Sequence, residues 1–173
     1  MSKKPKTETA VFGGGCFWGV EVAFSKIPEV IETEAGYMGH DRHYESLSYE
    51  DVCSDETGYV EVVKVTFDPE KLDYNELLET FWKYHDPTTL NRQGPDVGTQ
   101  YRSVIFYFND EQKKKALASK TALQKKLDKL GIKKKVVTAI EPAGKYFKAE
   151  EYHQKYLQKR GQTSCHVVNY MNQ

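Results

Sequence analysis

The pattern of hydrophobic and polar positions predicts alternating strands and helices from the beginning of the chain. A short apolar run over residues 9–12 is typical of a buried strand, and apolar side chains then recur at helical spacing from Phe17 to Ile27. Pro28 ends this helix, and residues 30–37 follow as a second predicted strand.

Residues 59–67 alternate in polarity and predict a strand with two different faces. Glu61 lies on the same face as Val63, Val65 and Phe67. A carboxyl group beside an apolar layer tends to have a raised pKa, although a place at the end of the strand would let Glu61 reach water instead. The pattern alone leaves both interpretations open.

Two further helices and two long polar loops complete the pattern. A capping box at Asp73 and Glu76 predicts the start of one helix, and residues 110–130 predict the other. Residues 40–57 and 85–100 show no sustained period, and we expect ordered loops of the kind that often carries functional side chains. The remaining predictions are strands over residues 101–108 and 136–140 and a short helix over residues 149–159.

This order of elements predicts an α+β fold. Helices would pack on one face of a mixed sheet, as in a two-layer ferredoxin-like plait with long loops and other additions. We expect the whole chain, residues 1–173, to form a single catalytic domain. Within it, residues 1–8 are expected to be disordered, and residues 141–173 to form an irregular C-terminal extension.

The composition narrows the possible functions. Lys plus Arg and Asp plus Glu number 25 each, so no net charge favours nucleic acid or an anionic membrane surface. A polar beginning and the lack of an apolar run of membrane length favour a cytoplasmic protein. The three widely spaced cysteines fit neither a disulfide framework nor a zinc knuckle, and His40 with His43 make only a weak candidate for a metal site.

Residues 13–19, Gly-Gly-Gly-Cys-Phe-Trp-Gly, place Cys16 at the start of the first predicted helix. Unpaired backbone N–H groups and the helix dipole favour an anion there, and so lower the pKa of a thiol. The glycines leave the backbone without side-chain bulk, so that a substrate could approach the sulfur along it. The alternative interpretation is a buried structural cysteine on a tight turn.

Several kinds of cysteine chemistry are compatible with a cysteine at a helix N-terminus. A hydrolase would need a histidine base, for which His85 and His153 are candidates. The segment after Cys16 lacks the arginine of a cysteine phosphatase and the Lys-Ser or Lys-Thr of a phosphate-binding loop. Redox chemistry remains, in which attack on an oxidised centre leaves a sulfenic acid that condenses with a second cysteine. Cys165 suits this second role, because it lies in a glycine-containing tail that we expect to move.

The segment from Gly14 to Gly19 resembles the signature of the peptide methionine sulfoxide reductase A family. Further segments resemble the family in order along the chain, and together they span about Gly13 to Leu157. Such an ordered set is far more specific than one short motif. The segments are Gly36-Tyr37, Tyr49 to Cys53, Thr57-Gly58 with Glu61, Asp68-Pro69, His85 to Thr88, Arg92 to Gly94, Gly98 to Ser103 and Glu151 to Leu157.

The resemblance implies a reductase for the S-epimer of methionine sulfoxide, free or in proteins, without a metal or organic cofactor. It implies that Cys16 attacks the sulfoxide sulfur and that Glu61 protonates the oxygen. A sulfoxide oxygen leaves poorly until it is protonated, so a carboxylic acid with a raised pKa suits this role. The other implied site residues are Tyr49 and Tyr101 as hydrogen-bond donors to the oxygen, Phe17 and Trp18 as the pocket for the S-methyl group, and Asp96 as a residue that helps to hold the substrate or an ordered water.

The chain departs from the commoner family pattern in ways that affect recycling. Tyr59 stands where many members have His, and no cysteine follows Cys165 in the sequence, so we expect no relay through two resolving cysteines. The resemblance therefore implies a disulfide between Cys16 and Cys165, with Cys53 as the alternative resolving cysteine and thioredoxin as the reductant. We expect a monomer. A non-catalytic reader of oxidised methionine remains a third class besides the reductase and the hydrolase.

Overall fold

A six-stranded mixed sheet is the centre of the fold in the computed structural model, which describes residues 4, 6–39 and 44–163. The strands are β1 (Glu8–Gly13), β2 (Val30–Met38), β3 (Val60–Phe67), β6 (Val104–Tyr107), β7 (Ala139–Pro142) and β8 (Tyr146–Lys148). Their order across the sheet is β7-β6-β1-β3-β2-β8. β6 and β7 pair in parallel, whereas the other neighbouring strands are antiparallel.

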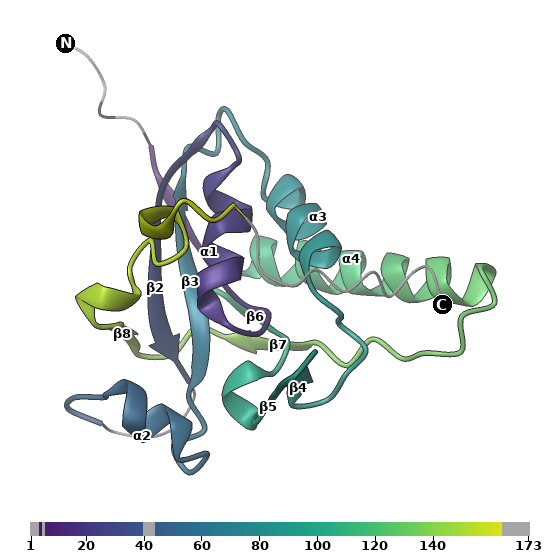
Figure 1. Ribbon diagram of the computed structural model, residues 1–173. Helices are drawn as coiled ribbons and strands as arrows, with labels where there is room; N and C mark the ends of the chain where they lie inside the picture. Colours follow the sequence, from purple (N-terminus) through teal and green to yellow (C-terminus); the bar gives the residue numbers. More distant parts are fainter. Residues whose placement is uncertain (1–3, 5, 40–43, 164–173) are drawn as a thin grey trace.

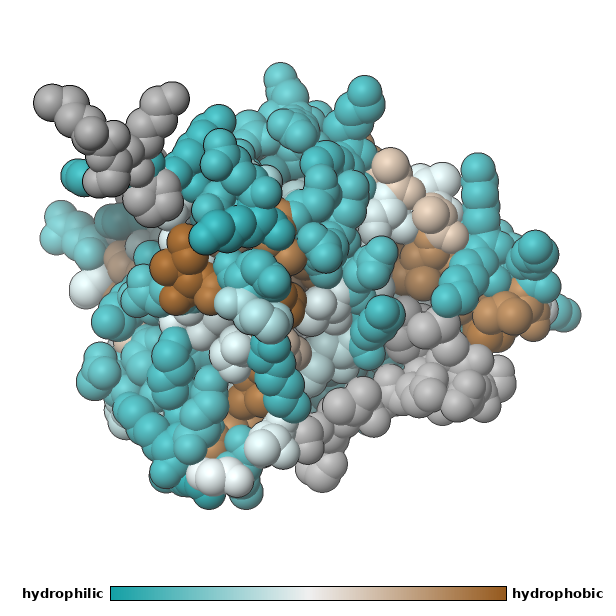
Figure 2. All heavy atoms as spheres, turned by 90° about the horizontal axis from the view of Figure 1, so that it is seen from above, coloured by the Kyte–Doolittle hydropathy of each residue, from teal (hydrophilic) through white to brown (hydrophobic). Residues whose placement is uncertain are grey.

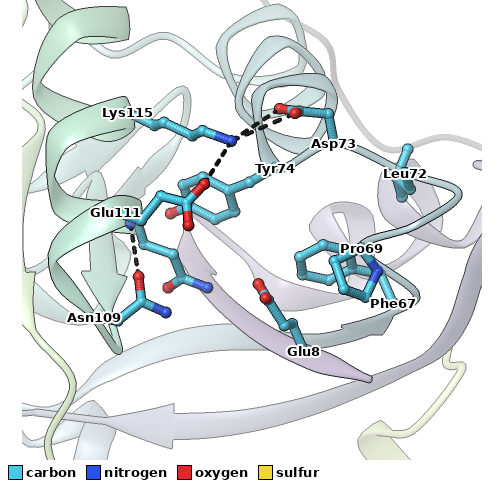
Figure 3. Close-up of a pocket in the computed structure, with 10 residues that line it drawn as sticks. Glu8, Phe67, Pro69, Leu72, Asp73, Tyr74, Asn109, Glu111 and Lys115 are labelled. Carbon is cyan, nitrogen blue, oxygen red and sulfur yellow. Dashed lines mark hydrogen bonds and ion pairs between the residues drawn. The ribbon is translucent and has the colours of Figure 1, made fainter. Parts of the chain in front are cut away.

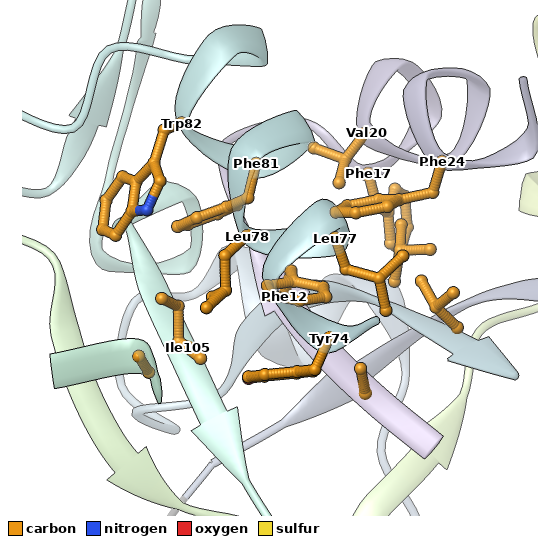
Figure 4. Packing of buried hydrophobic residues seen from close by; sticks show 14 of the residues in the cluster. Phe12, Phe17, Val20, Phe24, Tyr74, Leu77, Leu78, Phe81, Trp82 and Ile105 are labelled. Carbon is orange, nitrogen blue, oxygen red and sulfur yellow. The ribbon is translucent and has the colours of Figure 1, made fainter. Parts of the chain in front are cut away.

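Three helices pack on one side of this sheet (Figure 1). They are α1 (Phe17–Ser25), α3 (Tyr74–Tyr84) and α4 (Asp110–Lys129). Their apolar sides meet the sheet in one large core, in which Phe12 of β1 stacks on Phe24 of α1 and packs against Phe81 of α3 (Figure 4). The α+β class, the mixed sheet and the helical layer predicted from the sequence are confirmed.

β3 separates two hydrophobic clusters because its side chains alternate between the faces of the sheet. Val63 and Val65 lie in the large core under the helices, whereas Val60 and Val62 lie in a smaller cluster on the other face. The predicted alternation of this strand is therefore confirmed. Its consequence for function is that Glu61, near the start of β3, belongs to the face that carries the helices.

Local side-chain bonds fix where the helices start. At α3, Asp73 and Glu76 form the predicted capping box. At α4, the side chain of Asn109 accepts a hydrogen bond from the backbone N–H of Gln112. At α1, the N-cap Cys16 follows Gly15, whose φ of +97° belongs to the region that glycine enters without strain.

The two long loops contain short elements that the sequence pattern missed. Residues 40–57 include α2 (Tyr49–Cys53), which starts at a capping box of Ser48 and Asp51. Residues 85–100 include the hairpin of β4 (Arg92–Gln93) and β5 (Asp96–Val97) and most of the 3₁₀ turn η1 (Thr99–Tyr101). Elements of two to five residues are too short to produce a detectable period.

The helix predicted over residues 149–159 is wrong. Two 3₁₀ turns, η2 (Glu151–His153) and η3 (Gln158–Arg160), occupy this segment. Lys155 between them has a φ of +52°, which no α-helix contains. Three residues of this segment, His153, Gln154 and Leu157, are nevertheless buried against the rest of the fold.

Hydrophilic side chains cover most of the visible face in Figure 2, and the hydrophobic ones form a few separate patches. Across the described residues, no helix has the length and apolar character needed to cross a membrane.

Candidate active site

Cys16 lies where β1 passes into α1. It is the N-cap residue of α1 and is half-buried. The predicted position at a helix N-terminus is therefore confirmed. Such a position favours a negative charge, because the first backbone N–H groups of a helix have no partner within the helix.

The three glycines before Cys16 have a different role from the expected one. A Cβ atom on Gly13 would meet Val104 at 2.8 Å, and one on Gly15 would meet the side chain of Gln93 at 2.6 Å. A Cβ atom on Gly14 would lie 3.3 Å from the ring of His85. The space that the missing side chains leave is thus filled by the protein itself, and the glycines allow close packing of the turn rather than an approach of substrate along it.

Glu61 is the buried carboxyl group next to this turn. Its side chain is 2% exposed, and its Oε1 accepts a hydrogen bond of 3.4 Å from the backbone N–H of Phe17. Burial raises the pKa of Glu61 to about 8, against the lowering effects of the Phe17 N–H and the Tyr101 hydroxyl, while the charge of Asp96 raises it further. Of the two open interpretations of Glu61, the structure supports the carboxyl group held away from water.

Two tyrosines and an aspartate approach Glu61 from separate elements. Tyr49 is the first residue of α2, Tyr101 the last residue of η1, and Asp96 the first residue of β5. Burial raises the pKa of Tyr49, and it raises the pKa of Tyr101 to about 12, with the charge of Glu61 as a further cause in both. Both phenols therefore keep their protons at neutral pH and can donate hydrogen bonds.

Cys53 lies at the edge of the same group. It is the last residue of α2 and is exposed. Burial of its sulfur raises the pKa of Cys53, against the lowering effect of the hydrogen bond with the Tyr49 side chain, and the charge of Glu61 raises it again. The thiol is therefore near Tyr49 but has no tendency to be a thiolate.

Phe17 and Trp18 take different positions at the start of α1. Phe17 is 1% exposed and packs with ring-centre distances of 4.9 Å from His153 and 5.7 Å from Tyr37. Trp18 is half-buried, and its indole stacks on Tyr156 at 3.6 Å between ring centres. Trp18 is thus the one of the pair with a substantial surface open to a ligand.

The two histidines considered as bases are both bound inside the fold. In His85, Nδ1 donates to the carbonyl oxygen of Phe81 at 2.7 Å and Nε2 accepts from the Ser103 hydroxyl at 2.7 Å. Burial lowers the pKa of His85 to about 4. His153 accepts a hydrogen bond of 2.9 Å at Nδ1 from Trp18 Nε1. These bonds occupy the ring nitrogens that a hydrolase would need, apart from Nε2 of His153.

Three residues considered in the sequence analysis lie outside the described part of the chain. These are Cys165, His40 and His43. The described chain reaches Thr163, whose carbonyl oxygen accepts a hydrogen bond of 2.6 Å from Nζ of Lys26, just beyond the C-terminal end of α1. Among the described residues, no group of three His, Cys, Asp or Glu side chains could hold a metal ion.

A separate small cavity of about 110 Å³ lies far from this grouping. Glu8 and Phe67 line it, so it is at the ends of β1 and β3 opposite to Cys16 and Glu61. Tyr74, Asn109 and Lys115 are also in its lining (Figure 3). None of the residues expected at the active site borders this cavity.

Sequence reasoning missed Glu150, which binds two residues near the site. Its Oε2 accepts a hydrogen bond of 2.8 Å from the Tyr37 hydroxyl, and its Oε1 accepts one of 2.7 Å from the backbone N–H of Tyr49. A single glutamate in an irregular segment, about a hundred residues from its partners, carries no signal in the sequence alone.

An α+β enzyme with a cysteine at a helix N-terminus and a buried acid beside it is the class that this fold and site define. The comparisons with known proteins specify the family. The profile of the family described as peptide methionine sulfoxide reductase matches residues 8–173. The chain therefore belongs to the peptide methionine sulfoxide reductase family.

Individual relatives agree over nearly the full chain. Peptide methionine sulfoxide reductase MsrA of Methanothermobacter thermautotrophicus is 54% identical over 166 residues, which cover 95% of each chain. The MsrA of Methanoculleus marisnigri is 52% identical over 169 residues, or 97% of this chain and 99% of the relative.

Solved structures show the same fold. Mxr1 from Saccharomyces cerevisiae in its reduced form has a TM-score of 0.83 and 35% identity, and the match covers 98% of this chain and 93% of that one. The same yeast protein in complex with Trx2 has a TM-score of 0.61 and 25% identity, over 96% of this chain and 92% of that one.

Proposed function

We propose that the chain reduces the S-epimer of methionine sulfoxide, free or in proteins, to methionine by thiol chemistry. The observation that carries this proposal is the hydrogen bond from the Phe17 N–H to Oε1 of Glu61. This bond holds the Glu61 carboxyl group beside Phe17, the residue that follows Cys16. The carboxyl group keeps its proton near neutral pH. A nucleophilic thiol and a proton donor are the two groups that removal of a sulfoxide oxygen requires.

The Cys16 thiolate attacks the sulfoxide sulfur, and Glu61 transfers its proton to the oxygen. The S–O bond of the substrate breaks, the oxygen ends on the sulfur of Cys16 as a sulfenic acid, and methionine leaves. Cys16 is thereby oxidised by two electrons and the substrate is reduced by two. A carboxyl group whose pKa is near 8 is protonated in most molecules at neutral pH, which suits this step.

The surrounding side chains have matching roles in the proposal. Tyr49 and Tyr101 donate hydrogen bonds to the sulfoxide oxygen while negative charge develops on it. Their raised pKa values support this role, because a phenol must hold its proton to donate it. Phe17 and Trp18 form the apolar pocket for the S-methyl group, and Asp96 helps to hold the substrate or an ordered water.

The sulfenic acid is resolved by Cys165. Its thiol condenses with Cys16, which forms a disulfide and releases water, and the dithiol of thioredoxin reduces this disulfide. The complex of the yeast relative with Trx2 supports thioredoxin as the reductant. Cys53 is the alternative resolving cysteine, and its exposed position beside Tyr49 keeps this alternative open.

The remaining proposals concern the molecule as a whole. We infer a ferredoxin-like plait for β1, α1, β2, β3, α3 and β6, supported by the antiparallel order β6-β1-β3-β2. Residues 1–173 form one catalytic domain in which residues 141–173 are an extension that carries the resolving cysteine. The protein acts as a monomer in the cytoplasm and uses no metal or organic cofactor.

Mass spectrometry tests the central step. Reduced protein is mixed with methionine S-sulfoxide in the absence of a reductant, and the methionine released is compared with the oxidised Cys16. We expect one methionine for each Cys16 oxidised, and none from Cys16→Ser. Cys53→Ser is the matched control because it removes a thiol near the site and leaves the nucleophile.

Other results would favour the other classes. A stable thioester at Cys16 after treatment with an acylating probe would indicate a hydrolase. Binding of methionine sulfoxide without release of methionine would indicate a reader of oxidised methionine.

A further inference from the structure

Gln93 on β4 joins two segments that meet beside the site. Its Oε1 accepts a hydrogen bond of 2.9 Å from the backbone N–H of Asp86, and its Nε2 donates one of 2.9 Å to the carbonyl oxygen of the same residue. Asp86 is 5% exposed, so the two bonds occupy backbone groups that water hardly reaches. The amide of Gln93 therefore binds the hairpin of β4 and β5 to the chain that follows α3.

The aliphatic part of the Gln93 side chain lies on the turn before Cys16. A Cβ atom on Gly15 would meet Cγ of Gln93 at 2.6 Å and Cβ at 2.8 Å, so this part of Gln93 fills the space that a side chain would need. His85 fills the corresponding space at Gly14, and hydrogen bonds at both ring nitrogens fix its ring. His85 and Gln93 together form the surface on which the glycine turn packs.

The same hairpin fixes the position of Asp96. Gln93 and Asp96 are direct partners in the register of β4 and β5, and the side chains of such partners lie on one face of a hairpin. The face that packs on Gly15 is therefore also the face that carries the Asp96 carboxylate. The effect of the Asp96 charge on Glu61 agrees with this orientation. A shift of the hairpin would move Asp96 relative to both Glu61 and Cys16.

We propose that Gln93 is a positioning residue that holds Asp96 in place relative to the turn that carries Cys16. This inference rests on the proposed function, in which Asp96 helps to hold the substrate or an ordered water. The amide supplies the anchor at Asp86, and the aliphatic part supplies the contact with Gly15. Gln93 touches no substrate in this role, and its loss slows the reaction through the position of Asp96.

The kinetic test compares Gln93→Met with Gln93→Glu. Met has a shape close to that of Gln and keeps the contact with Gly15, but it removes both hydrogen bonds to Asp86. The readout is the single-turnover rate of methionine release at saturating methionine S-sulfoxide, relative to the wild type at the same pH. We expect Gln93→Met to lower this rate about tenfold, because a displacement of about 1 Å in a site can lower a rate by up to about a hundredfold.

Gln93→Glu makes the contact with Asp86 depend on pH. A protonated carboxyl group can accept from the Asp86 N–H and donate to its carbonyl oxygen, as the amide does, whereas a carboxylate can only accept. Glutamate titrates near about pH 4.3 in water, and partial burial beside a carbonyl oxygen raises this pKa. The variant should keep most of the wild-type rate at about pH 5 and lose it as the pH rises to about 7. An equal loss in Gln93→Met and Gln93→Glu at the lower pH would overturn the inference.

Gln124 on α4 provides a matched control. Its Oε1 accepts from the Val136 N–H at 2.9 Å and its Nε2 donates to the Lys134 carbonyl oxygen at 3.0 Å, so it makes the same pair of bonds to the backbone. No residue of α4 belongs to the proposed site. Gln124→Met should therefore lower the stability in urea unfolding but keep the wild-type rate. A loss of rate equal to that of Gln93→Met would overturn the inference.

Two further measurements separate this inference from the proposed function. In an Asp96→Asn background, Gln93→Met should lower the rate by less than about twofold, because the two residues act as a pair, and a further tenfold loss would overturn the inference. In the wild-type protein, NMR should show a nuclear Overhauser contact between the Gln93 side chain and the α-protons of Gly15, a readout that needs no turnover. Absence of this contact overturns the inference while the Cys16 chemistry stands, and loss of methionine release in the wild type overturns both.

Discussion

The backbone N–H of Phe17 donates to Oε1 of Glu61 at 3.4 Å and so joins the first residue of α1 to a strand 44 residues further along the chain. The other carboxyl oxygen, Oε2, is buried without a hydrogen-bond partner among the described residues. The Tyr101 hydroxyl is near enough to lower the Glu61 pKa but does not bond to Oε2. A buried polar atom without a hydrogen-bond partner lowers the stability of the fold. A substrate oxygen that accepts a proton from Oε2 would supply the missing partner.

Replacement of Glu61 by Gln should slow the reduction step by about a hundredfold or more, since a general acid typically contributes this much. The measurement is the rate of methionine release in a single turnover. Glu34→Gln is a suitable control, because Glu34 binds Lys64 at 3.0 Å and the Tyr146 hydroxyl at 2.8 Å within the same sheet. An unchanged single-turnover rate in Glu61→Gln would remove Glu61 from the role of acid.

The ionisation of Glu61 should also appear in the pH dependence of the single-turnover rate. A general acid must be protonated, and burial raises the pKa of Glu61 to about 8, so the rate should fall as the pH rises through about 8. Glu61→Gln should lack this fall, although its rate is lower throughout. A fall near pH 8 that persists unchanged in the Gln variant would assign it to another group.

The stability of the fold should change with pH for the same reason. Between the ordinary pKa of 4.5 and about 8, the folded protein keeps the Glu61 proton and the unfolded chain has lost it. Stability is then fully present below pH 4.5 and declines as the pH rises to about 8, by at most about 1.4 kcal/mol per pH unit. Glu61→Gln should match the wild type near pH 4 and exceed it at pH 8 in urea unfolding.

A carboxylate whose pKa is lowered in the folded protein should make stability rise with pH, which is opposite to the effect of Glu61. Burial acts to raise the pKa of Glu34, but the hydrogen bonds and charge of Lys64 and the Tyr146 hydroxyl outweigh it and lower the pKa. Glu34→Gln should therefore be less stable than the wild type above pH 4.5, and the difference should disappear as the pH falls. The same trend in both Gln variants would contradict the assignment for Glu61.

The longer helices and strands, and the side of the sheet on which Glu61 lies, could be predicted from the sequence. Phe17 and Phe24 have helical spacing, and the alternation around Glu61 places it on the face of the large core, because burial imposes these periods on a sequence. Each pattern depends on residues close together along the chain.

The contacts between distant segments could not be predicted. Besides burial itself, the pKa of Glu61 depends on Phe17, Asp96 and Tyr101, which come from three separate segments. The bond from Trp18 to His153 joins residues 135 positions apart. No period or motif encodes such a pair, since only the folded sheet brings the two segments together.

The two candidate resolving cysteines give different results on substitution. Cys165→Ser should still release one methionine per protein, because this step needs only Cys16 and the acid, but it should lose turnover with thioredoxin. Cys53→Ser should keep both activities. The measurements are methionine released without reductant and the steady-state rate with thioredoxin. Full steady-state turnover in Cys165→Ser, with loss in Cys53→Ser, would assign the disulfide to Cys53.

An ion pair between the buried Glu21 and the partly exposed Lys155 holds the segment after η2 to the middle of α1. Glu21 is fully buried, and it accepts hydrogen bonds from the backbone N–H of Lys155 at 2.7 Å, from Nζ of Lys155 at 3.1 Å and from the Thr33 hydroxyl at 3.0 Å. Lys155→Met leaves the Glu21 carboxylate buried without its cation. Because the Lys155 side chain is 42% exposed, the loss should be smaller than the about 3 kcal/mol of a fully buried pair, but larger than that of a surface pair.

Urea unfolding of Lys155→Met should show this loss, whereas Lys148→Met, which removes an exposed cation 3.6 Å from Glu34, should cost about 0.5 kcal/mol or less. Adding Glu21→Gln to Lys155→Met should restore part of the stability, because the unpaired charge is then gone. Equal losses in Lys155→Met and Lys148→Met would mean that water reaches Glu21 once the lysine is removed. The ion pair would then not be what holds the segment leading to Thr163 against α1.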